Sequence, residues 1–385
     1  MKFLKCLSGL PIERPPIWFM RQAGRYLSEY RDTRKKAGSF LDLCYNSELA
    51  TEVTLQPIDR FGFDAAILFA DILLILDALG VKVQFIEGHG PLLDPDKNKR
   101  DIQRINNKGQ IHEKLFPVYE TVKKLKKQLP KDVPLIGFAG APWTLATYLI
   151  NGKGEQGSLT AKKFLIENNE DFEKIINLLT DATIEYLIMQ IRSGADVIKI
   201  FDSWAGALNA DMVLRYSLKP IKRIVSEIKK KHPKIPFIVF PRSVNTIYSN
   251  FSNEEHFDVL AVDQFLDRKW IANEIQPKKI IQGNLDPIFL TQNRGVLLQE
   301  LEKVTEDLEL LPISTYNKTK MVAERVFMSY SNLARIHCIR PATVCGLSPR
   351  MRLDVAVNLL TFQAISKGKI TVLGGNQIRP NIHID

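Results

Sequence analysis

Two arginines four residues apart, Arg21 and Arg25, follow a short apolar stretch at Pro16–Met20. Guanidinium groups are permanently charged, planar forks that bind carboxylates through paired hydrogen bonds. At the end of a strand, such a pair suits a ligand that carries several carboxylates. The alternative is a solvated pair at the start of a helix, which would take no part in chemistry.

Asp71 interrupts an apolar run that extends from Ala65 to Leu79. A carboxylate is rarely buried unless it is paired or used. This aspartate is therefore expected to accept ligand N–H groups and to stabilise a cationic intermediate with its fixed negative charge. The alternative is an aspartate that caps the helix after it.

Tyr148 follows a loop rich in Gly, Ala and Pro, which suits close approach to a ligand, although an ordinary half-buried tyrosine fits as well. Ser203 lies in Phe-Asp-Ser-Trp-Ala-Gly and fits either a binding group or a helix N-cap. A nucleophilic role for Ser203 is disfavoured, because no histidine lies near it and no G-x-S-x-G motif surrounds it.

Short apolar runs that do not alternate with polar residues recur along the chain, each followed by a helical pattern, and this is typical of parallel strands. The predicted strands are Pro16–Met20, Ala65–Ala70, Pro134–Ala139, Val197–Phe201, Pro236–Phe240, Val259–Val262 and Lys279–Gln282. The helical patterns include Ala161–Leu179 with Asp181–Ser193, Met212–Lys231 and Asp286–Glu302.

Repeated strand–helix units without a second sheet predict a (β/α)8 TIM-type barrel, with a doubly wound open sheet as the alternative. Chemistry in such barrels lies at the carboxyl ends of the strands. The residues at these ends form a polar ring, namely Arg21, Arg25, Asp71, Tyr148, Asp202, Ser203, Arg242, Asn284 and Asp286. Only seven units precede Glu302, so the barrel is expected to lack its native eighth β/α unit.

Composition narrows the class of protein further. With 45% apolar and 25% charged residues, the 385-residue chain is an ordinary globular protein, and its net charge of +10 would attract a polyanionic small molecule. No basic stripe with interleaved aromatics indicates nucleic acid, and no apolar run is long enough to span a membrane. No signal peptide is recognised and the four cysteines form no CxxC pair, so a cytoplasmic protein with reduced thiols is expected. The scattered histidines give no metal-ligand spacing, and no nucleotide-binding glycine motif occurs.

Several motifs closely resemble those of the uroporphyrinogen decarboxylase family, and the likeness extends from about residue 8 to about residue 303. They are Pro16-Ile-Trp-Phe-Met-Arg-Gln-Ala-Gly-Arg-Tyr26, Thr54-Leu-Gln-Pro57, Phe69-Ala-Asp71, Gly137-Phe-Ala-Gly-Ala-Pro-Trp-Thr-Leu-Ala-Thr-Tyr148, Phe240-Pro-Arg242 and Ile281-Gln-Gly-Asn-Leu-Asp-Pro287. The family consists of (β/α) barrels that are usually homodimers and act in haem biosynthesis.

The resemblance implies decarboxylation of the four acetate side chains of uroporphyrinogen III to give coproporphyrinogen III, with no metal or organic cofactor. It implies a catalytic role for Asp71, which would also bind the pyrrole N–H groups. The substrate-binding residues implied by the resemblance are Arg21, Gln22, Ala23, Gly24, Arg25, Arg34, Phe40, Asp71, Tyr148 and Ser203.

From residue 304 the chain departs from this family, because no Gly-His-Gly segment follows residue 303 where the family has one. Residues 304–385 instead resemble the C-terminal part of an NAD-dependent epimerase/dehydratase, an extended short-chain dehydrogenase. The motifs that carry this likeness are Tyr316-Asn-Lys-Thr-Lys320, Cys338-Ile-Arg-Pro-Ala-Thr-Val344 and Gly375–Asp385. We therefore expect two domains, a barrel over residues 1–303 and a foreign α/β segment over 304–385, with helices at Lys318–Tyr330 and Leu353–Ser366 and a strand at Arg335–Val344.

Three other functions stay open. The first is an impaired barrel that binds porphyrinogen without turnover. The second is an NAD-dependent epimerase acting through the tail, which is disfavoured because the dinucleotide-binding half is missing. The third is a barrel methyltransferase, which would need His and Cys zinc ligands that this sequence does not supply.

Overall fold

The computed structural model describes residues 1–10, 12, 14–86, 90–93, 110–154, 158–304, 343–345 and 381–383. The chain forms two compact units, Met1–Leu308 and Glu309–Asp385, which are considered separately. No helix within the described ranges is long and apolar enough to cross a membrane.

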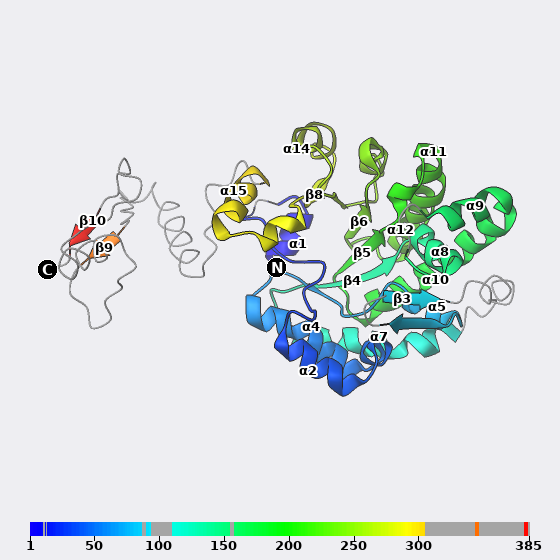
Figure 1. The fold of residues 1–385 in the computed structure, drawn as a ribbon, viewed down its shortest axis with the longest axis horizontal. Coiled ribbons are helices and arrows are strands. Elements are labelled where there is room, and N and C mark those ends of the chain that lie inside the picture. Colours follow the sequence, from blue (N-terminus) through cyan, green and yellow to red (C-terminus); the bar gives the residue numbers. More distant parts are fainter. Residues whose placement is uncertain are drawn as a thin grey trace. The chain divides into compact units, whose positions relative to one another are not determined.

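The first unit is built on a curled sheet of six parallel strands (Figure 1). In order across the sheet, the strands are β1 (Ala66–Ile67), β4 (Leu135–Gly140), β5 (Val197–Asp202), β6 (Phe237–Pro241), β7 (Val259–Ala261) and β8 (Ile280–Gln282). The spatial order follows the chain order without reversal, which is the arrangement of a (β/α) barrel. A doubly wound sheet would reverse its direction of growth at a switch point, so that alternative is wrong.

The central strands are buried along their whole length. All residues of β4 and β6 are buried, and β5 has one half-buried residue, Phe201. Both faces of these strands are therefore covered, which explains why their sequences are continuous apolar runs. The register pairs Ile136 with Val197 and Ile198 with Phe237.

The predicted strand Pro16–Met20 is not a strand in the structure, although it lies beside the start of β1. The N–H of Asp64 donates to the carbonyl of Ile17 (2.9 Å), and the N–H of Ile17 donates to the Asp64 carboxylate (2.7 Å). Pro15 and Pro16 have no N–H to donate, and a side chain takes the donor of Ile17, so a regular ladder does not form. All the other predicted strands are present.

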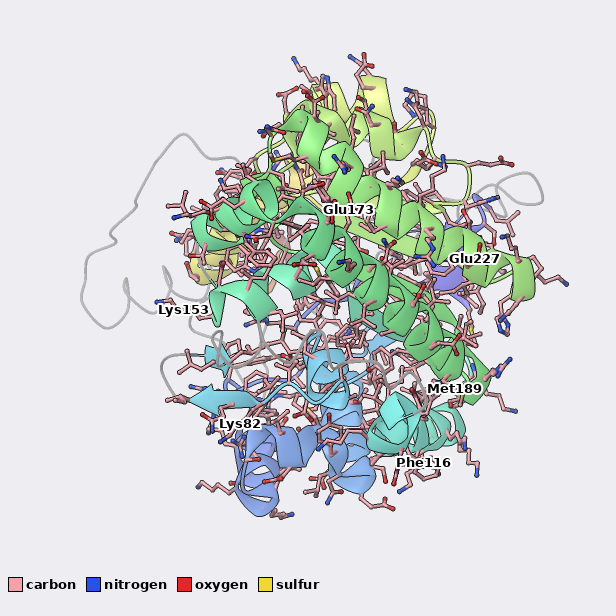
Figure 2. All side chains as sticks on the ribbon, turned by 90° about the vertical axis from the view of Figure 1, so that its right-hand side faces the viewer. Lys82, Phe116, Lys153, Glu173, Met189 and Glu227 are labelled. Carbon is pink, nitrogen blue, oxygen red and sulfur yellow. The ribbon has the colours of Figure 1, made fainter. Side chains whose placement is uncertain are left out.

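Helices cover the outside of the sheet. The longest are α4 (Ser47–Phe61), α7 (Gln110–Gln128), α10 (Asn169–Ser193) and α12 (Lys219–Lys231). Helix α10 packs against α7, α8 (Pro142–Asn151), α12 and β4. Figure 2 looks onto this layer, with Glu173 and Met189 near the two ends of α10 and Glu227 on the neighbouring α12.

Shorter elements complete the unit. The α-helices are α1 (Lys2–Leu7), α2 (Ser28–Ala37), α3 (Phe40–Tyr45), α5 (Leu74–Ala78), α9 (Leu159–Glu167), α11 (Ala210–Val213), α13 (Tyr248–Ser252), α14 (Arg268–Trp270) and α15 (Arg294–Val304). The 3-10 and π turns are η2 (Ala205–Ala207), η3 (Leu214–Leu218), η4 (Asn245–Ile247), η5 (Ile271–Ile275) and η6 (Pro287–Thr291). Strands β2 (Val83–Ile86) and β3 (Gly90–Leu93) form an antiparallel hairpin.

Local capping explains several helix boundaries. Asn46 accepts hydrogen bonds from the N–H groups of Glu48 and Leu49 at the start of α4, and Gly62 ends that helix in the left-handed conformation (φ 63°). The predicted break near Thr180 is wrong, since α10 continues through it and the Thr180 hydroxyl donates to Ile176 within the helix. The predicted helix Asp286–Glu302 is divided into η6 and α15.

The second unit contains β9 (Thr343–Cys345) and β10 (Asn381–His383), which pair in parallel. The end of the predicted strand Arg335–Val344 coincides with β9. The predicted helices Lys318–Tyr330 and Leu353–Ser366 lie outside the described residues.

Candidate active site

The predicted site residues lie at or just beyond the carboxyl ends of the parallel strands. Asp71 follows β1, Tyr148 lies on α8 after β4, and Ser203 directly follows β5. Because parallel strands end at one edge of a sheet, these residues from distant parts of the sequence share that edge.

Asp71 is half-buried, and its Oδ1 accepts a hydrogen bond from the N–H of Leu73 (2.8 Å). The bond fixes the carboxyl group just before α5, but it does not cap that helix: the N-cap of α5 is Leu73 and no side chain caps it, so the capping alternative is wrong. Among the described residues its Oδ2 accepts no hydrogen bond. Burial raises the pKa of Asp71 to about 6, while the Leu73 N–H and the positive charge of Arg21 oppose the rise.

Arg21, Asp71 and Tyr148 form one electrostatic group. Burial raises the pKa of Tyr148, the Asp71 carboxylate raises it further, and the Trp204 indole and Arg21 oppose the rise. The Tyr148 ring meets the Trp204 ring edge-on, with centroids 6.2 Å apart. Arg21 and Asp71 are therefore near enough to Tyr148 to affect its ionisation, and the Trp204 ring lies beside the phenol.

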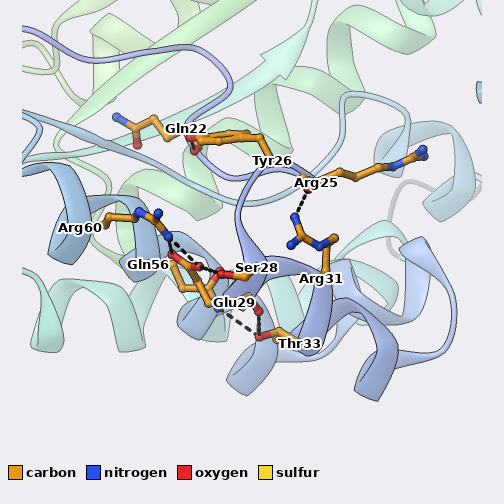
Figure 3. A network of polar contacts seen from close by, with 9 residues as sticks. All are labelled: Gln22, Arg25, Tyr26, Ser28, Glu29, Arg31, Thr33, Gln56 and Arg60. Carbon is orange, nitrogen blue, oxygen red and sulfur yellow. Dashed lines mark hydrogen bonds and ion pairs between the residues drawn. The ribbon is translucent and has the colours of Figure 1, made fainter.

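The other two arginines lie near Tyr30. The charges of both Arg34 and Arg25 lower the pKa of Tyr30, against burial, which raises it. Arg34 donates to the carbonyl of Gly38 (2.6 Å), and Arg31 donates to the carbonyl of Arg25 (2.7 Å). Figure 3 shows Arg25 extending away from Gln22, so these two side chains point in different directions.

Gln22 directs its side chain inward. It is 2% exposed, and its amide bonds to the backbone of Ala65 and Ile67. Ala23 and Gly24 follow it and are half-buried. The Gln22 amide is therefore committed to the backbone just before and within β1.

Phe40 lies in an aromatic cluster. Its ring is 4.6 Å from that of Phe85 and 5.8 Å from that of Phe69, measured between centroids. Phe69 also contacts Tyr30 (5.9 Å). The cluster joins α2 and α3, which carry Tyr30 and Phe40, to Phe69, two residues before Asp71.

The loop of Ser203 is held by Asp202, a residue of the predicted polar ring that was not assigned a binding role. The buried Asp202 carboxylate accepts hydrogen bonds from the hydroxyls of Thr144 (2.6 Å) and Ser217. Thr144 in turn accepts from the N–H of Trp204 (3.2 Å). Burial raises the pKa of Asp202 to about 6, and the two hydroxyls oppose the rise. The sequence feature that could have indicated this structural role of Asp202 is a charged residue at the end of a buried apolar strand.

Two other members of the predicted ring serve the fold. The Asn284 amide donates to the carbonyls of Asp263 (3.1 Å) and Leu266 (3.0 Å). Asp286 caps η6 by accepting from the N–H of Ile288 (2.9 Å). Arg242, by contrast, is exposed at the end of β6.

Lys199 is a charged residue that the sequence patterns did not single out. It is fully buried in β5, and its Nζ has no hydrogen-bond partner within the described part of the chain. The Nζ lies 4.9 Å from the ring centre of Trp18, 5.0 Å from Phe201 and 5.4 Å from Phe240. Burial holds its pKa well below the usual range of a lysine. A single lysine inside an apolar strand does not indicate from the sequence which aromatic rings will surround it.

The described residues contain no group of three or more His, Cys, Asp or Glu side chains that could hold a metal ion.

An open (β/α) barrel with arginines, a carboxylate of raised pKa and a tyrosine near its strand ends defines a barrel enzyme for an anionic substrate. The family model described as "Uroporphyrinogen decarboxylase (URO-D)" matches residues 1–310. This chain belongs to the uroporphyrinogen decarboxylase family.

Relatives support the assignment. The uroporphyrinogen decarboxylase of Jannaschia sp. is 50% identical over 308 residues, which cover 80% of this chain and 90% of the relative. Those of Cereibacter sphaeroides (304 residues, 79% and 89% covered) and Rickettsia bellii (310 residues, 79% and 89% covered) are each 46% identical. Among solved structures, a methyltransferase from Methanosarcina mazei is similar, with a TM-score of 0.64 and 19% identity over 85% of this chain and 98% of that one. This last likeness shows the barrel fold alone.

Proposed function

We propose that this protein is a uroporphyrinogen decarboxylase, which converts the four acetate side chains of uroporphyrinogen III to methyl groups and yields coproporphyrinogen III. The observation that carries the proposal is the grouping of Arg21, Asp71 and Tyr148 at the strand ends of a chain that belongs to this family.

Each decarboxylation balances in protons and electrons. A proton adds to a ring carbon of the pyrrole, and the resulting cation is the electron sink for the adjacent acetate. The bond between the acetate methylene and its carboxylate breaks, CO2 leaves, and the electron pair moves into the ring. A proton then adds to the methylene carbon to form the methyl group, and the ring-carbon proton is released. Because the ring accepts the electrons itself, no organic cofactor is required.

Asp71 stabilises the cationic ring. Its Oδ2 accepts no bond from the described residues and is available to pyrrole N–H groups, while the Leu73 N–H holds Oδ1 in place. With a pKa of about 6, the carboxylate is mostly ionised at neutral pH. One preorganised charge of this kind is worth on the order of 3 kcal/mol in the transition state.

The arginines Arg21, Arg25 and Arg34 bind the substrate's carboxylates, and Ser203 binds one more. Phe40 and Tyr148 line the cleft against the macrocycle, and the backbone from Gln22 to Gly24 lies between the arginines. The octacarboxylate substrate and a protein of net charge +10 attract each other at long range.

A second candidate function is porphyrinogen binding without efficient turnover. The observation that favours it is the open sheet, in which β1 and β8 each have one strand neighbour among the described residues. Beside β1, Ile17 and Gln22 supply hydrogen bonds but no strand, and β8 has no second strand beside it among the described residues, so these two strands do not close the sheet.

Residues 304–385 form, in our proposal, a separate segment related to the C-terminal part of an NAD-dependent epimerase/dehydratase. The family match ends at residue 310, and the compact units divide between Leu308 and Glu309, which supports a boundary near residue 303. This segment adds no redox activity, since the glycine-rich nucleotide-binding half is missing. We further propose a cytoplasmic homodimer.

One assay separates the two candidates. Purified protein is incubated anaerobically with uroporphyrinogen III, and products with seven to four carboxylates are separated by chromatography. The decarboxylase function predicts all four steps, whereas binding of the substrate without any product supports the second candidate.

A further inference from the structure

Gln22 has an unusual position between the arginines and the sheet. Its side chain is 2% exposed, whereas Arg21 and Arg25 on either side are exposed. Its Nε2 donates to the carbonyl of Ala65 (2.7 Å), and its Oε1 accepts from the N–H of Ile67 (3.2 Å). One side-chain amide therefore satisfies two backbone groups, one just before β1 and one within it.

These contacts replace those of a neighbouring strand. On its other side β1 bonds to β4, with the N–H of Ala66 donating to Pro134 (3.0 Å) and that of Leu68 to Ile136 (3.0 Å). The carbonyl of Ala65 and the N–H of Ile67 point to the opposite edge of β1. A neighbouring strand would supply one donor and one acceptor to them there. The Gln22 amide supplies both there.

Asp71 lies beyond the end of β1, four residues after Ile67. Gln22 directly follows Arg21, and Ile17 before it is tied to Asp64 by two hydrogen bonds. Arg21 therefore lies between two anchored residues, Ile17 and Gln22. Both are bonded to residues 64–67, the segment that leads into Asp71.

We propose that Gln22 is a positioning residue, whose side-chain amide docks the arginine segment onto β1 and so sets the distance between the Arg21 guanidinium and the Asp71 carboxylate. The inference rests on the proposed function for the identity of the ligand. The physical basis is that the Arg21 guanidinium and the Asp71 carboxylate are both held in place relative to β1. Less conformational entropy is then lost when the two groups bind one ligand.

Gln22→Met tests the inference, because methionine has a similar length but can neither donate to Ala65 nor accept well from Ile67. With the segment released, uroporphyrin, the oxidised macrocycle with the same eight carboxylates, is expected to bind about tenfold more weakly. The KM for uroporphyrinogen III is expected to rise by a similar factor with little change in kcat, since Arg21 contacts the carboxylates before and during reaction.

Gln190 on α10 provides a matched control. Its fully buried amide also pairs with a strand backbone, accepting from the N–H of Phe138 (2.9 Å) and donating to its carbonyl (2.9 Å), but it does not contact the arginine segment. Gln190→Met removes the same chemistry from β4. It is expected to lower the melting temperature as Gln22→Met does, while uroporphyrin affinity stays unchanged.

The outcomes are distinct. Equal uroporphyrin affinities of the two variants would overturn the inference and show that Gln22 contributes stability alone. Slow hydrogen exchange of the Ile67 amide in the unaltered protein would support the docking contact even if Gln22→Met does not fold, and rapid exchange would refute it. Absence of turnover in the unaltered protein would instead count against the proposed function, and the uroporphyrin and exchange measurements would still decide the role of Gln22.

Discussion

The positive charge of Arg21 acts on the Asp71 carboxyl: burial raises the pKa of Asp71 to about 6, and the Leu73 N–H and, after it, Arg21 oppose the rise. The two residues are far apart in the chain and come from different segments. In the proposed mechanism, one arginine both binds a substrate carboxylate and helps to keep the catalytic carboxylate ionised near neutral pH.

Replacing Asp71 with asparagine tests the role of the negative charge. The amide carbonyl of the new side chain can still accept from the Leu73 N–H, so the local fold is retained. Loss of about 3 kcal/mol of transition-state stabilisation predicts a fall in kcat of about a hundredfold. Anaerobic product analysis measures the rate and uroporphyrin titration measures binding, which should be largely preserved. Full activity in Asp71→Asn would refute its catalytic role.

The pH dependence of kcat/KM should show the ionisation of Asp71. The carboxylate is the active form, so the rate is expected to fall as the pH decreases through about 6, the pKa of Asp71 in the free protein. Asp71→Asn should have no such acid limb. A wild-type profile that stays flat down to about pH 5, well below this pKa, would be incompatible with the assignment.

Arg21→Met should move the acid limb to higher pH, because the charge that lowers the pKa of Asp71 is removed. Arg25→Met is the matched control, since it removes an equal charge from the same segment and Arg25 is not among the groups that shift the pKa of Asp71. Both variants should raise KM. An identical displacement of the limb in both would point to net charge rather than to the Arg21–Asp71 pair.

Lys199→Met is expected to stabilise the protein. The variant replaces an amine that has no hydrogen-bond partner among the described residues by an apolar chain of similar volume inside an aromatic cage. Relief of an unsatisfied buried group predicts a gain of about 1–3 kcal/mol in the free energy of unfolding at neutral pH. Urea unfolding measures it. Lys229→Met is the contrasting control, since Lys229 pairs with Asp258 (2.9 Å) and its loss should destabilise.

The pH dependence of that gain has a definite sign. Burial lowers the pKa of Lys199 in the folded protein, so between this lowered pKa and 10.5 the unfolded chain binds more protons than the folded one. Stability contributed at this position therefore rises with pH until the unfolded lysine, with a pKa near 10.5, has also lost its proton. The difference between Lys199→Met and the unaltered protein should shrink between neutral pH and that value. A constant difference would argue against a neutral amine.

Calorimetric titration with NAD tests the C-terminal segment. The Tyr316–Lys320 pair needs a bound nicotinamide for redox chemistry, and the chain has no glycine-rich cradle to hold one. No heat of binding is expected at millimolar NAD. Saturable binding would reopen the epimerase alternative.

The local sequence pattern was sufficient to predict the six parallel strands of the sheet and the polar residues that follow them. Buried parallel strands are continuous apolar runs, so a charged residue such as Asp71 or Asp202 is conspicuous where a strand stops. The motifs around Arg21 and Tyr148 predicted the family, which is confirmed. The strand predicted at Pro16–Met20 failed because its two proline neighbours and the Asp64 side chain disrupt a ladder that an apolar run alone suggests.

Only the tertiary structure decided what each polar group does. Gln22 belongs to a binding motif, but whether its amide faces a ligand or the edge of β1 depends on a strand more than forty residues away, as its contacts with Ala65 and Ile67 show. Asn284 likewise serves the backbone around it, Asp202 binds two side-chain hydroxyls, and Lys199 is enclosed by rings from three separate segments. Hydrogen bonds and burial are set by neighbours in space, and a sequence pattern records only neighbours along the chain.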